Sequence, residues 1–381
     1  MNELLLSEEE TLLKSTVREF ADQILAPAAA AYDQSGEFPW NNVRGLAELG
    51  LFGLTVDETY GGSGGTTRQL AVVVEEIARG CGSTSVIYIA HLSLCTQFIH
   101  MFGTEAQKQR WVPPLARGEK IGAMALTEPL AGSDAAAMRT SVTRSDGHYV
   151  LNGSKLFTTN AVEADTFVVL ATHDRSLRTK GIDALVVEPG PGFMVNPQHG
   201  KMGMRATSTA ELVFDEFPVP EENRLGEEGE GFSALMDVLN TSRISIAAQC
   251  VGLAQAAYEA AVQYAKQREA FGKRLADFQG TQWAIADMAT SVEAARMLVH
   301  RAASLRDAGQ PFVTEASMAK LFASRVAVES ADRAVQIHGG TGYFAPTLVE
   351  RLYRDAKVTE IYEGTSEVQR MIISRNILGT Q

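Results

Sequence analysis

The sequence predicts an α+β protein of three segregated domains, because the spacing of its hydrophobic residues changes twice along the chain of 381 residues. The first part has helical spacing, the middle part consists of short β-rich runs between turns, and the last part is helical and rich in alanine. We therefore expect an N-terminal helical domain at residues 1–118, a middle β-domain of sandwich or barrel type at 119–226, and a C-terminal bundle of long helices at 227–381.

The N-terminal region carries helix signals from its start. Ser7 and Glu10 have the spacing of a capping box, so a helix should begin directly after Ser7. Its predicted buried face consists of Leu13, Val17, Phe20 and Ile24. Two further helices are predicted at 68–80 and 105–118, each ending at a glycine. The run YGGSGG at 60–65 lies outside any β-α-β context, so we interpret it as a flexible connector.

The middle region reads as strands. Its β-rich runs lie at 148–160, 165–174, 181–193 and 209–220, with Asn-Gly and Pro-Gly pairs among them. The segment LNGS at 151–154 contains an Asn-Gly pair, which predicts a hairpin turn.

Long helices return after Gly231. Between Phe232 and Lys266 the chain has no proline and a single glycine, Gly252, so one long helix is expected there. The following helical runs place alanine at small-residue packing positions, as a bundle of long helices requires.

Composition excludes several classes of function. A formal net charge of −12 argues against a nucleic-acid groove and against binding to an anionic membrane. The three cysteines, at 81, 95 and 250, have neither metal-ligand spacing nor the pattern of a disulfide framework, so we expect no metal and a reducing compartment. The acidic start SEEE at 7–10 is unlike a targeting peptide, and no apolar run reaches the length of a membrane span. A cytoplasmic protein is expected.

The segment IYEGTSE at 361–367 contains a candidate catalytic residue. Glu363 lies between an aromatic ring and a glycine, directly before a predicted helix. It is either a solvated loop glutamate or a general base whose pKa is raised by apolar neighbours, with Gly364 admitting a ligand close to the backbone. Two other loops, at 126–140 and 336–342, could bind a polar ring or a phosphate, or serve only as a loop and a helix stop.

Taken together, a series of segments resembles the acyl-CoA dehydrogenase family. In chain order they are MALTEPLAGSD, KLFTTN, KMGMRATSTAELVFDEFPVP, GEEGEGF, QREAFGK, QIHGGTGY and ERLYRDAKVTEIYEGTSEVQR. The resemblance runs from about Leu6 to Leu378, and the segment THDRSLRTKGIDALVVEPGPGF is most similar to the short-chain (butyryl-CoA) members. It implies a three-domain flavoprotein, with a C-terminal four-helix bundle, that binds FAD and forms a homo-oligomer, usually a tetramer.

The resemblance also implies which residues hold FAD. Around the flavin ring it places Met124, Leu126, Thr127, Gly132, Ser133, Phe157, Thr158 and Thr159. Toward the FAD of a neighbouring subunit it places Arg268, Phe271, Gln279, Gln336, Ile337, His338, Gly339 and Gly340. Thr365 and Glu367 should lie along the same cofactor, where helix N-terminal amides favour phosphate.

For catalysis, the resemblance implies that Glu363 removes the α-proton of an acyl-CoA and that FAD accepts the β-hydride, giving the trans-2-enoyl-CoA. Electrons would then pass to an electron-transfer flavoprotein. The backbone N–H of Glu363 would donate a hydrogen bond to the thioester oxygen. Contacts to the acyl-CoA are implied for Ser133, Asn240, Arg243, Tyr362 and Gly364.

Three positions depart from the family pattern. Leu130 stands where glycine or asparagine is common, Phe157 where tryptophan is usual, and Asn240 where aspartate is common. Acyl chain length should depend on side chains that close the far end of the pocket, which we expect from the helix around His91 to Cys95.

Other functions fit the same residues in part. An acyl-CoA oxidase and a carrier-protein-linked acyl dehydrogenase would share the fold, and a nitroalkane oxidase would favour aspartate at the position of Glu363. An acidic helical scaffold without enzymatic activity would be colourless, whereas a flavoprotein is yellow.

Overall fold

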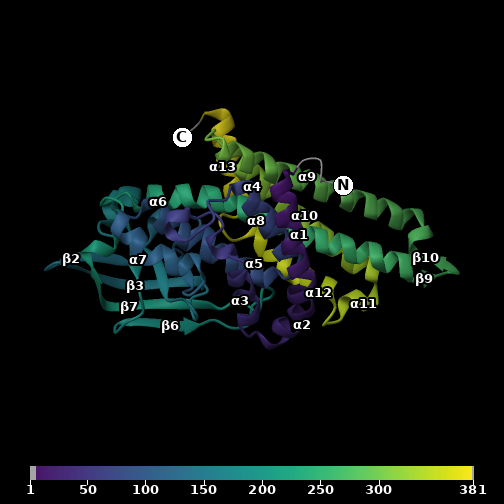
Figure 1. The fold of residues 1–381 in the computed structure, drawn as a ribbon, viewed down its shortest axis with the longest axis horizontal. Helices are drawn as coiled ribbons and strands as arrows, with labels where there is room; N and C mark the ends of the chain where they lie inside the picture. Colours follow the sequence, from purple (N-terminus) through teal and green to yellow (C-terminus); the bar gives the residue numbers. More distant parts are fainter. Residues whose placement is uncertain (1–5, 380–381) are drawn as a thin grey trace.

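The computed structural model describes residues 6–379 and confirms the predicted α+β class. Figure 1 shows the β-domain at one end of the molecule, the N-terminal helices in the centre, and long C-terminal helices that extend to the other end.

Helices make up the N-terminal region. They are α1 (Glu8–Phe20), α2 (Ala26–Ser35), α3 (Trp40–Glu48), α4 (Thr67–Gly80), α5 (Gly82–Ile89), α6 (Gln97–Phe102) and α7 (Glu105–Ala116). The predicted capping box is confirmed, because the Ser7 hydroxyl accepts from the Glu10 N–H at 3.1 Å and the Glu10 carboxylate accepts from the Ser7 N–H at 2.9 Å.

The predicted buried face of this first helix is wrong at Ile24, whose side chain is 43% exposed. A π-helical segment, Ala21–Leu25, follows α1 directly. Since a π-turn contains more residues than an α-turn, it rotates the following residues around the axis. Ala21 and Leu25 are therefore the buried residues here, below the buried Val17.

The glycine-rich run at 60–65 is a packed turn, so the prediction of a flexible connector is wrong. The N–H of Gly64 donates to the Val56 carbonyl at 2.8 Å, and that of Gly65 to the Leu54 carbonyl at 2.7 Å. A Cβ on Gly62 would lie 2.1 Å from the Val56 oxygen. Glycine is needed here because two backbone segments touch.

The middle domain is an eight-stranded, mostly antiparallel sheet in the order β6-β7-β3-β2-β4-β5-β8, with β1 paired in parallel to β4. Its strands are β1 (Gly122–Ala125), β2 (Ser141–Ser145), β3 (His148–Thr159), β4 (Thr166–Thr172), β5 (Ile182–Val187), β6 (Phe193–Pro197), β7 (Thr209–Pro220) and β8 (Arg224–Leu225). Aromatic packing fills one part of its core, where the ring of Phe193 lies 5.0 Å from that of Phe167 and 4.9 Å from that of Phe214.

The predicted hairpin turn at LNGS is wrong, because these residues lie inside β3. The hairpin between β2 and β3 turns at Asp146 and Gly147, whose φ angles of 38° and 82° suit a tight two-residue turn. Gly153 instead marks a shift in register between β3 and β7. Next to it, the Asn152 amide forms two hydrogen bonds with Glu216.

The C-terminal region contains the expected long helices. They are α8 (Gly231–Gln267), α9 (Gln279–Asp307), α10 (Val313–His338), α11 (Gly340–Tyr343), α12 (Leu348–Lys357) and α13 (Ser366–Leu378). Gly252, the one glycine predicted inside α8, lies where a Cβ would approach the Glu75 carbonyl of α4 to 2.2 Å. The two helices therefore pack with their backbones close together.

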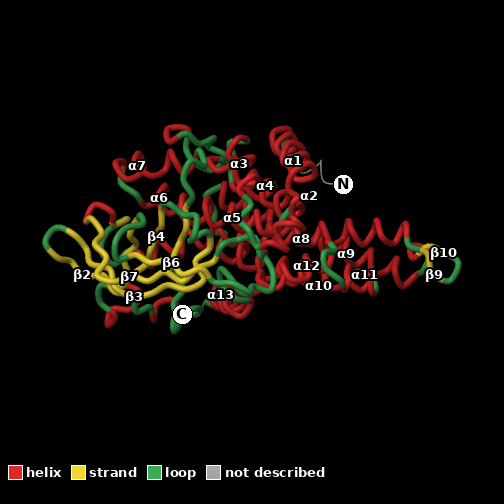
Figure 2. The backbone as a smooth tube through the Cα atoms, turned by 90° about the horizontal axis from the view of Figure 1, so that it is seen from below, coloured by secondary structure: helices red, strands yellow, loops and turns green. Residues whose placement is uncertain are grey.

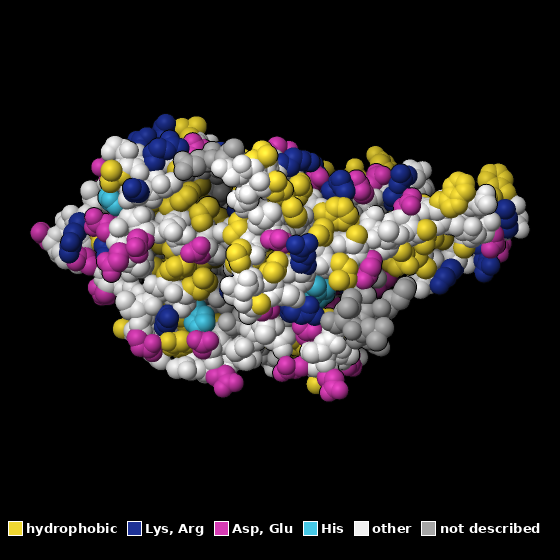
Figure 3. Space-filling model, turned by 90° about the horizontal axis from the view of Figure 1, so that it is seen from above, with side chains coloured by type: hydrophobic (Ala, Val, Ile, Leu, Met, Phe, Trp, Pro, Cys, Tyr) yellow, Lys and Arg dark blue, Asp and Glu magenta, His cyan; other side chains and the backbone are white. Residues whose placement is uncertain are grey.

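A short hairpin, β9 (Glu269–Ala270) and β10 (Lys273–Arg274), joins α8 to α9 at the far end of the bundle, as Figure 2 shows. We call residues 268–279 and 336–340 the bundle tip. Hydrophobic side chains gather on its surface (Figure 3), among them Phe271, which is 96% exposed.

One helical stretch, Gly82–Phe102, is long and apolar enough to cross a membrane by length and composition, which the sequence reading did not anticipate. In the fold 78% of its apolar 18-residue window is buried inside the protein, as expected for a core helix.

Candidate active site

Glu363 lies in a short loop, residues 361–365, between a 3-10 turn (Val358–Glu360) and α13. We call it the carboxylate loop. Glu363 and Gly364 both have left-handed backbones, with φ of 51° and 95°. This conformation is unfavourable for glutamate, and strain of this kind persists only where the surroundings enforce it. The φ of 95° at Gly364 would strain any other residue, so the position favours glycine.

The surroundings shift the pKa of the Glu363 carboxyl. Burial raises this pKa to about 7, against the lowering effects of a hydrogen bond from the Ser242 hydroxyl and of the charges on Lys320 and Arg243. A carboxyl with a pKa near 7 is partly ionised at neutral pH and basic enough to accept a proton. The solvated-loop interpretation is therefore the weaker of the two.

Several side chains hold this loop in place. The Lys320 ammonium donates to the Gly364 carbonyl at 2.7 Å, and the Gln369 amide donates to the same oxygen at 2.9 Å. The Tyr362 hydroxyl donates to the amide oxygen of Gln249, whose nitrogen donates to the Ser85 hydroxyl at 2.8 Å. The loop is thus tied to α10, α13, α8 and α5.

The backbone N–H of Glu363 donates to no residue that the structure describes. A free N–H beside a basic carboxylate can stabilise negative charge that develops on a substrate oxygen.

Arg243 and Asn240 form a pair on the same stretch of α8. The Arg243 side chain is 4% exposed, and its Nη1 donates to the Asn240 amide oxygen at 2.5 Å. Burial lowers its pKa, while the charge on Glu363 raises it. Its Nε is buried and has no acceptor among residues 6–379. Asn240 thus holds the guanidinium with a neutral oxygen.

The predicted flavin-ring residues gather in the middle domain. We call residues 124–133 and 157–159 the ring-side loops. Phe157 is 64% exposed on a backbone with φ of 57°, and Leu130 is 67% exposed beside the exposed Gly132 and Ser133. The remaining predicted residues, Met124, Leu126, Thr127 and Thr159, are half-buried, while Thr158 is buried.

Sequence reasoning missed what braces these ring-side loops. Lys155 and Glu128 form a buried ion pair at 2.7 Å. The same ammonium donates to the Leu126 carbonyl at 3.1 Å, and the Thr127 carbonyl accepts from the Leu156 N–H at 2.7 Å. The two residues lie 27 positions apart in the sequence, and this separation carries no recognisable signal, because the pair forms only when β3 packs beside the loop.

Helix α5 connects the ring-side loops with the carboxylate loop. The Asn160 amide, next to Thr159, donates to the Ile87 carbonyl at 3.1 Å and to the Gly122 carbonyl at 3.3 Å. Two residues before Ile87, the Ser85 hydroxyl accepts from Gln249, which holds Tyr362. The fold therefore brings both the ring-side loops and the carboxylate loop against α5.

The bundle tip lies apart from these groups within one chain, at the end of the molecule opposite the hairpin between β2 and β3 (Figure 1). Arg268, Phe271, Gln279 and Gln336 are exposed there. His338 is engaged within the chain, since its ring stacks on Tyr264 at 4.1 Å. The other predicted tip residues are the half-buried Ile337 and the exposed Gly339 and Gly340.

The donor set suits a flavin dinucleotide. Phe157 offers an aromatic face, and Cβ atoms placed on Gly132, Gly339 and Gly340 would meet nothing within 4 Å, so a ligand can approach the backbone. Thr365 caps α13, where the helix N-terminus favours a phosphate, and Glu367 is exposed on its first turn.

The segment expected to limit chain length is the π-helix Ala90–Thr96. His91 is fully buried, with its Nδ1 accepting from the Gly122 N–H and its Nε2 facing the Leu115 carbonyl, both at 3.0 Å. Cys95 is also fully buried, and Leu94 is half-buried. Leu94 is thus the residue of this segment with open surface.

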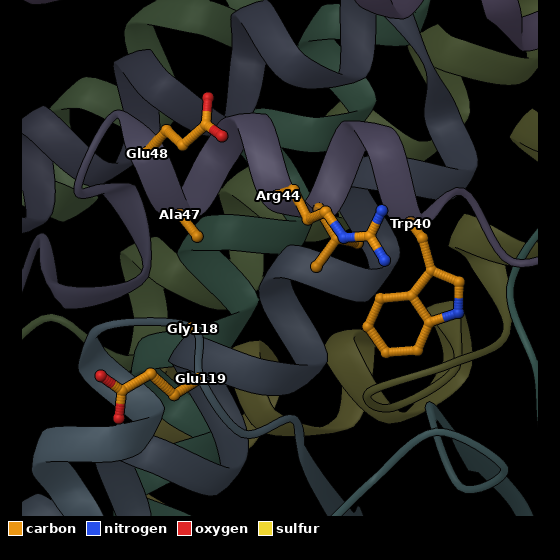
Figure 4. A pocket seen from close by; sticks show the side chains of 7 residues that line it. Trp40, Arg44, Ala47, Glu48, Gly118 and Glu119 are labelled. Atoms are coloured by element: carbon orange, nitrogen blue, oxygen red, sulfur yellow. The ribbon is translucent and has the colours of Figure 1, made fainter.

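A pocket of about 390 Å³ lies elsewhere, along α3 (Figure 4). It is lined by Trp40, Val43, Arg44, Ala47, Glu48, Gly118 and Glu119, none of which is a predicted site residue. Among the described residues no group of three or more His, Cys, Asp and Glu side chains could hold a metal ion.

Comparison with known proteins identifies the class of protein to which this fold belongs. Models of the N-terminal, middle and C-terminal domains of acyl-CoA dehydrogenase match residues 7–119, 123–217 and 229–378. The chain belongs to the acyl-CoA dehydrogenase family and is an oxidoreductase.

Individual relatives match over almost the whole chain. The short-chain specific acyl-CoA dehydrogenase of Clostridium acetobutylicum is 48% identical over 98% of both chains. Acryloyl-CoA reductase (NADH) of Anaerotignum propionicum is 43% identical over 98% of this chain and 95% of its own.

Solved structures of acyl-CoA dehydrogenases have the same fold as this chain. Butyryl-CoA dehydrogenase from Megasphaera elsdenii superposes with a TM-score of 0.96 at 42% identity, covering 98% of this chain and 99% of its own. A chain from a structure described as the electron transferring flavoprotein of Acidaminococcus fermentans gives 0.96 at 45% identity, covering 98% of each. A glutaryl-CoA dehydrogenase from Mycobacterium smegmatis in complex with FADH2 gives 0.94 at 31% identity, covering 99% of this chain and 96% of its own.

Proposed function

We propose that the protein dehydrogenates a short-chain acyl-CoA to the trans-2-enoyl-CoA, with Glu363 removing the α-proton. One observation carries the proposal: the Glu363 carboxyl has a pKa raised by burial to about 7 and lies beside its own unpaired backbone N–H. A base of this strength can take a proton at neutral pH and release it afterwards.

The chain's own residues would perform the acid–base part of the reaction. The Glu363 N–H would donate to the thioester oxygen and stabilise the charge that develops as the α-carbon loses its proton to the carboxylate. Arg243, a buried cation with an unpaired Nε, would favour the ionised carboxylate and contact the thioester arm together with Ser133. FAD, when bound, supplies the acceptor for the hydride that leaves the β-carbon.

Substrate length and electron partner rest on the relatives. The short-chain specific relative at 48% identity supports a short acyl chain. The match to a chain from an electron transferring flavoprotein structure supports such a flavoprotein as the electron acceptor. The acryloyl-CoA reductase among the relatives is named for the opposite direction, so direction depends on the electron partner.

We also propose a homotetramer in which the bundle tip of one subunit reaches the FAD of its neighbour. The exposed Arg268 and Phe271 support this arrangement, since they lie at the far end of the helical bundle, apart from the ring-side loops of their own chain. The three cysteines are free and buried, which fits the proposed cytoplasmic location.

The test is a turnover series with the purified protein on saturated acyl-CoAs from four to sixteen carbons, using an artificial electron acceptor. We expect a yellow protein with the highest kcat/KM on the short chains. Matched thioesters of an acyl carrier protein, and oxygen as sole acceptor, distinguish the two alternative enzymes. A colourless protein that reduces no acceptor with any acyl-CoA would refute the proposal.

A further inference from the structure

Lys320 is a buried cation in α10 and belongs to none of the sequence motifs described above. Its side chain is fully buried, and its ammonium donates to the Gly364 carbonyl at 2.7 Å. Placing an ammonium in the protein interior is costly unless hydrogen bonds and opposite charges compensate. The carbonyl that compensates here belongs to the residue after Glu363.

The groups that face Lys320 come from three directions. Cys250 and Arg243 approach from α8, Glu360 from the 3-10 turn, and Glu363 from the carboxylate loop. Cys250 is a buried thiol whose pKa burial raises to about 12, so it is neutral near pH 7. The cations around Glu363 are therefore Lys320 and Arg243, and both act on its carboxylate.

We infer that Lys320 is a positioning residue for Glu363, holding the carboxylate loop through the Gly364 carbonyl and stabilising the ionised carboxylate by its charge. The inference rests on the proposed role of Glu363 as the base. Among residues 6–379 Lys320 forms no hydrogen bond with the Glu363 carboxylate itself, and its contact with the loop is the one to the Gly364 carbonyl.

The hydrogen bond and the charge act through different routes. The Gly364 carbonyl belongs to the peptide that follows two left-handed residues, and Lys320 and Gln369 together fix the plane of that peptide. Fixing the plane holds the Glu363 backbone in its strained conformation. The charge acts through space, where a buried environment screens it less than water would.

The pH dependence of the reaction rate follows from the ionisation of Lys320 and Glu363. Burial lowers the pKa of Lys320 to about 8, so the ammonium is still largely charged where Glu363 ionises, at about pH 7. Removing the positive charge raises the pKa of a neighbouring carboxyl. The rising limb of the rate against pH should then move to higher pH, whereas a purely structural lysine would leave the limb in place.

The experiment measures flavin reduction by butyryl-CoA in rapid mixing, over pH 5.5–9.5, on FAD-replete wild type, Lys320→Met and Lys320→Arg. For Lys320→Met we expect the limb to move up by about one pH unit, the low end of shifts caused by one opposite charge. Lys320→Arg keeps the charge, so its limb should stay at the wild-type pH while its plateau rate falls.

Lys201→Met is the matched control. Lys201 is another lysine whose pKa burial lowers to about 8, and it donates to the Thr209 hydroxyl in the middle domain at 3.1 Å. This variant should lower the melting temperature and leave the limb unmoved.

An unmoved limb in Lys320→Met would overturn the inference. If that variant does not fold, Lys320→Arg decides, because a limb displaced upward despite the retained charge would contradict it equally. Glu363→Gln separates this failure from that of the proposed function: normal bleaching in Glu363→Gln refutes the base itself, whereas an inactive Glu363→Gln with an unmoved limb in Lys320→Met refutes only the role of Lys320.

Discussion

The carboxylate loop and the bundle tip differ in how much of their environment one chain provides. Around Glu363 the chain itself supplies several partners for the carboxylate loop, namely Ser242, Lys320 and Gln369. At the bundle tip, Arg268 forms no ion pair with any described residue, and Phe271 is almost fully exposed. A single chain thus supplies hydrogen-bond partners around its candidate base, whereas its candidate cofactor contacts at the bundle tip stay exposed.

The physical reason lies in what each task requires. Raising the pKa of a carboxyl takes burial, which a chain achieves in its own core. The proposed sharing of FAD between subunits would need exposed groups at a distance from that core, and the long α8 and α9 carry exposed side chains to the bundle tip. Each prediction below tests one side of this contrast, beginning with the largest effect.

Glu363→Gln should have the largest effect, because glutamine keeps the shape of the side chain but cannot take a proton. Flavin reduction by butyryl-CoA should slow by roughly 10²–10⁴-fold, the usual contribution of a positioned base. Rapid mixing that follows the loss of oxidised-flavin colour measures it. Glu363→Asp should retain part of the rate. FAD content and acyl-CoA binding should persist in both variants, and near-normal bleaching in Glu363→Gln would point to another base.

Arg268→Ala tests the other side of the contrast. Losing a charge-assisted contact of about 1.5–3 kcal/mol should weaken FAD retention by about 10–100-fold and destabilise the oligomer with it. Flavin release on dilution and size-exclusion chromatography measure the two effects. Arg274→Ala is the control, since its exposed ion pair with Asp277 lies within the same hairpin region. Equal FAD loss in Arg268→Ala and Arg274→Ala would contradict the proposed contact between Arg268 and FAD.

Arg243→Ala should mainly raise KM, by about tenfold, because the lost cation faces the proposed thioester arm. It should also move the rising limb of the pH profile upward, since the charge of Arg243 lowers the pKa of Glu363. Steady-state kinetics between pH 6 and 9 separate the two effects. Arg325→Ala, which removes an exposed ion pair with Glu329, serves as the control. Unchanged KM and an unmoved pH profile in Arg243→Ala would contradict the proposed contact with the substrate and leave Arg243 a structural role only.

Ser242→Ala should have the smallest effect. The Ser242 hydroxyl donates to the Glu363 carboxylate and lowers its pKa, so its removal should raise that pKa further above its ordinary value. A hydrogen bond of about 0.5–1.5 kcal/mol corresponds to an upward shift of the limb by about half to one pH unit. The plateau rate at high pH should not change. A downward shift would contradict the assigned donor.

Much of the fold followed from local pattern. The change from helical to β-rich spacing predicted the three regions, and the absence of proline between Phe232 and Lys266 predicted α8. Glu363, Arg243 and the ring-side loops were found because their neighbours in sequence form recognisable segments. Their assigned roles remain predictions that the variants above test.

What the sequence determined by itself is therefore the order of elements, the family and the candidate base, since these depend on residues near one another in the chain. Only the tertiary structure decided that Ile24 is exposed, that the hairpin turns at Asp146–Gly147 and not at Asn152–Gly153, and that Ser242 and Lys320 hold the carboxylate loop. Ser242 lies 121 residues from Glu363, and no local pattern carries such a pairing. Burial and charge act through space, so the pKa of about 7 at Glu363 exists only once the helices have packed.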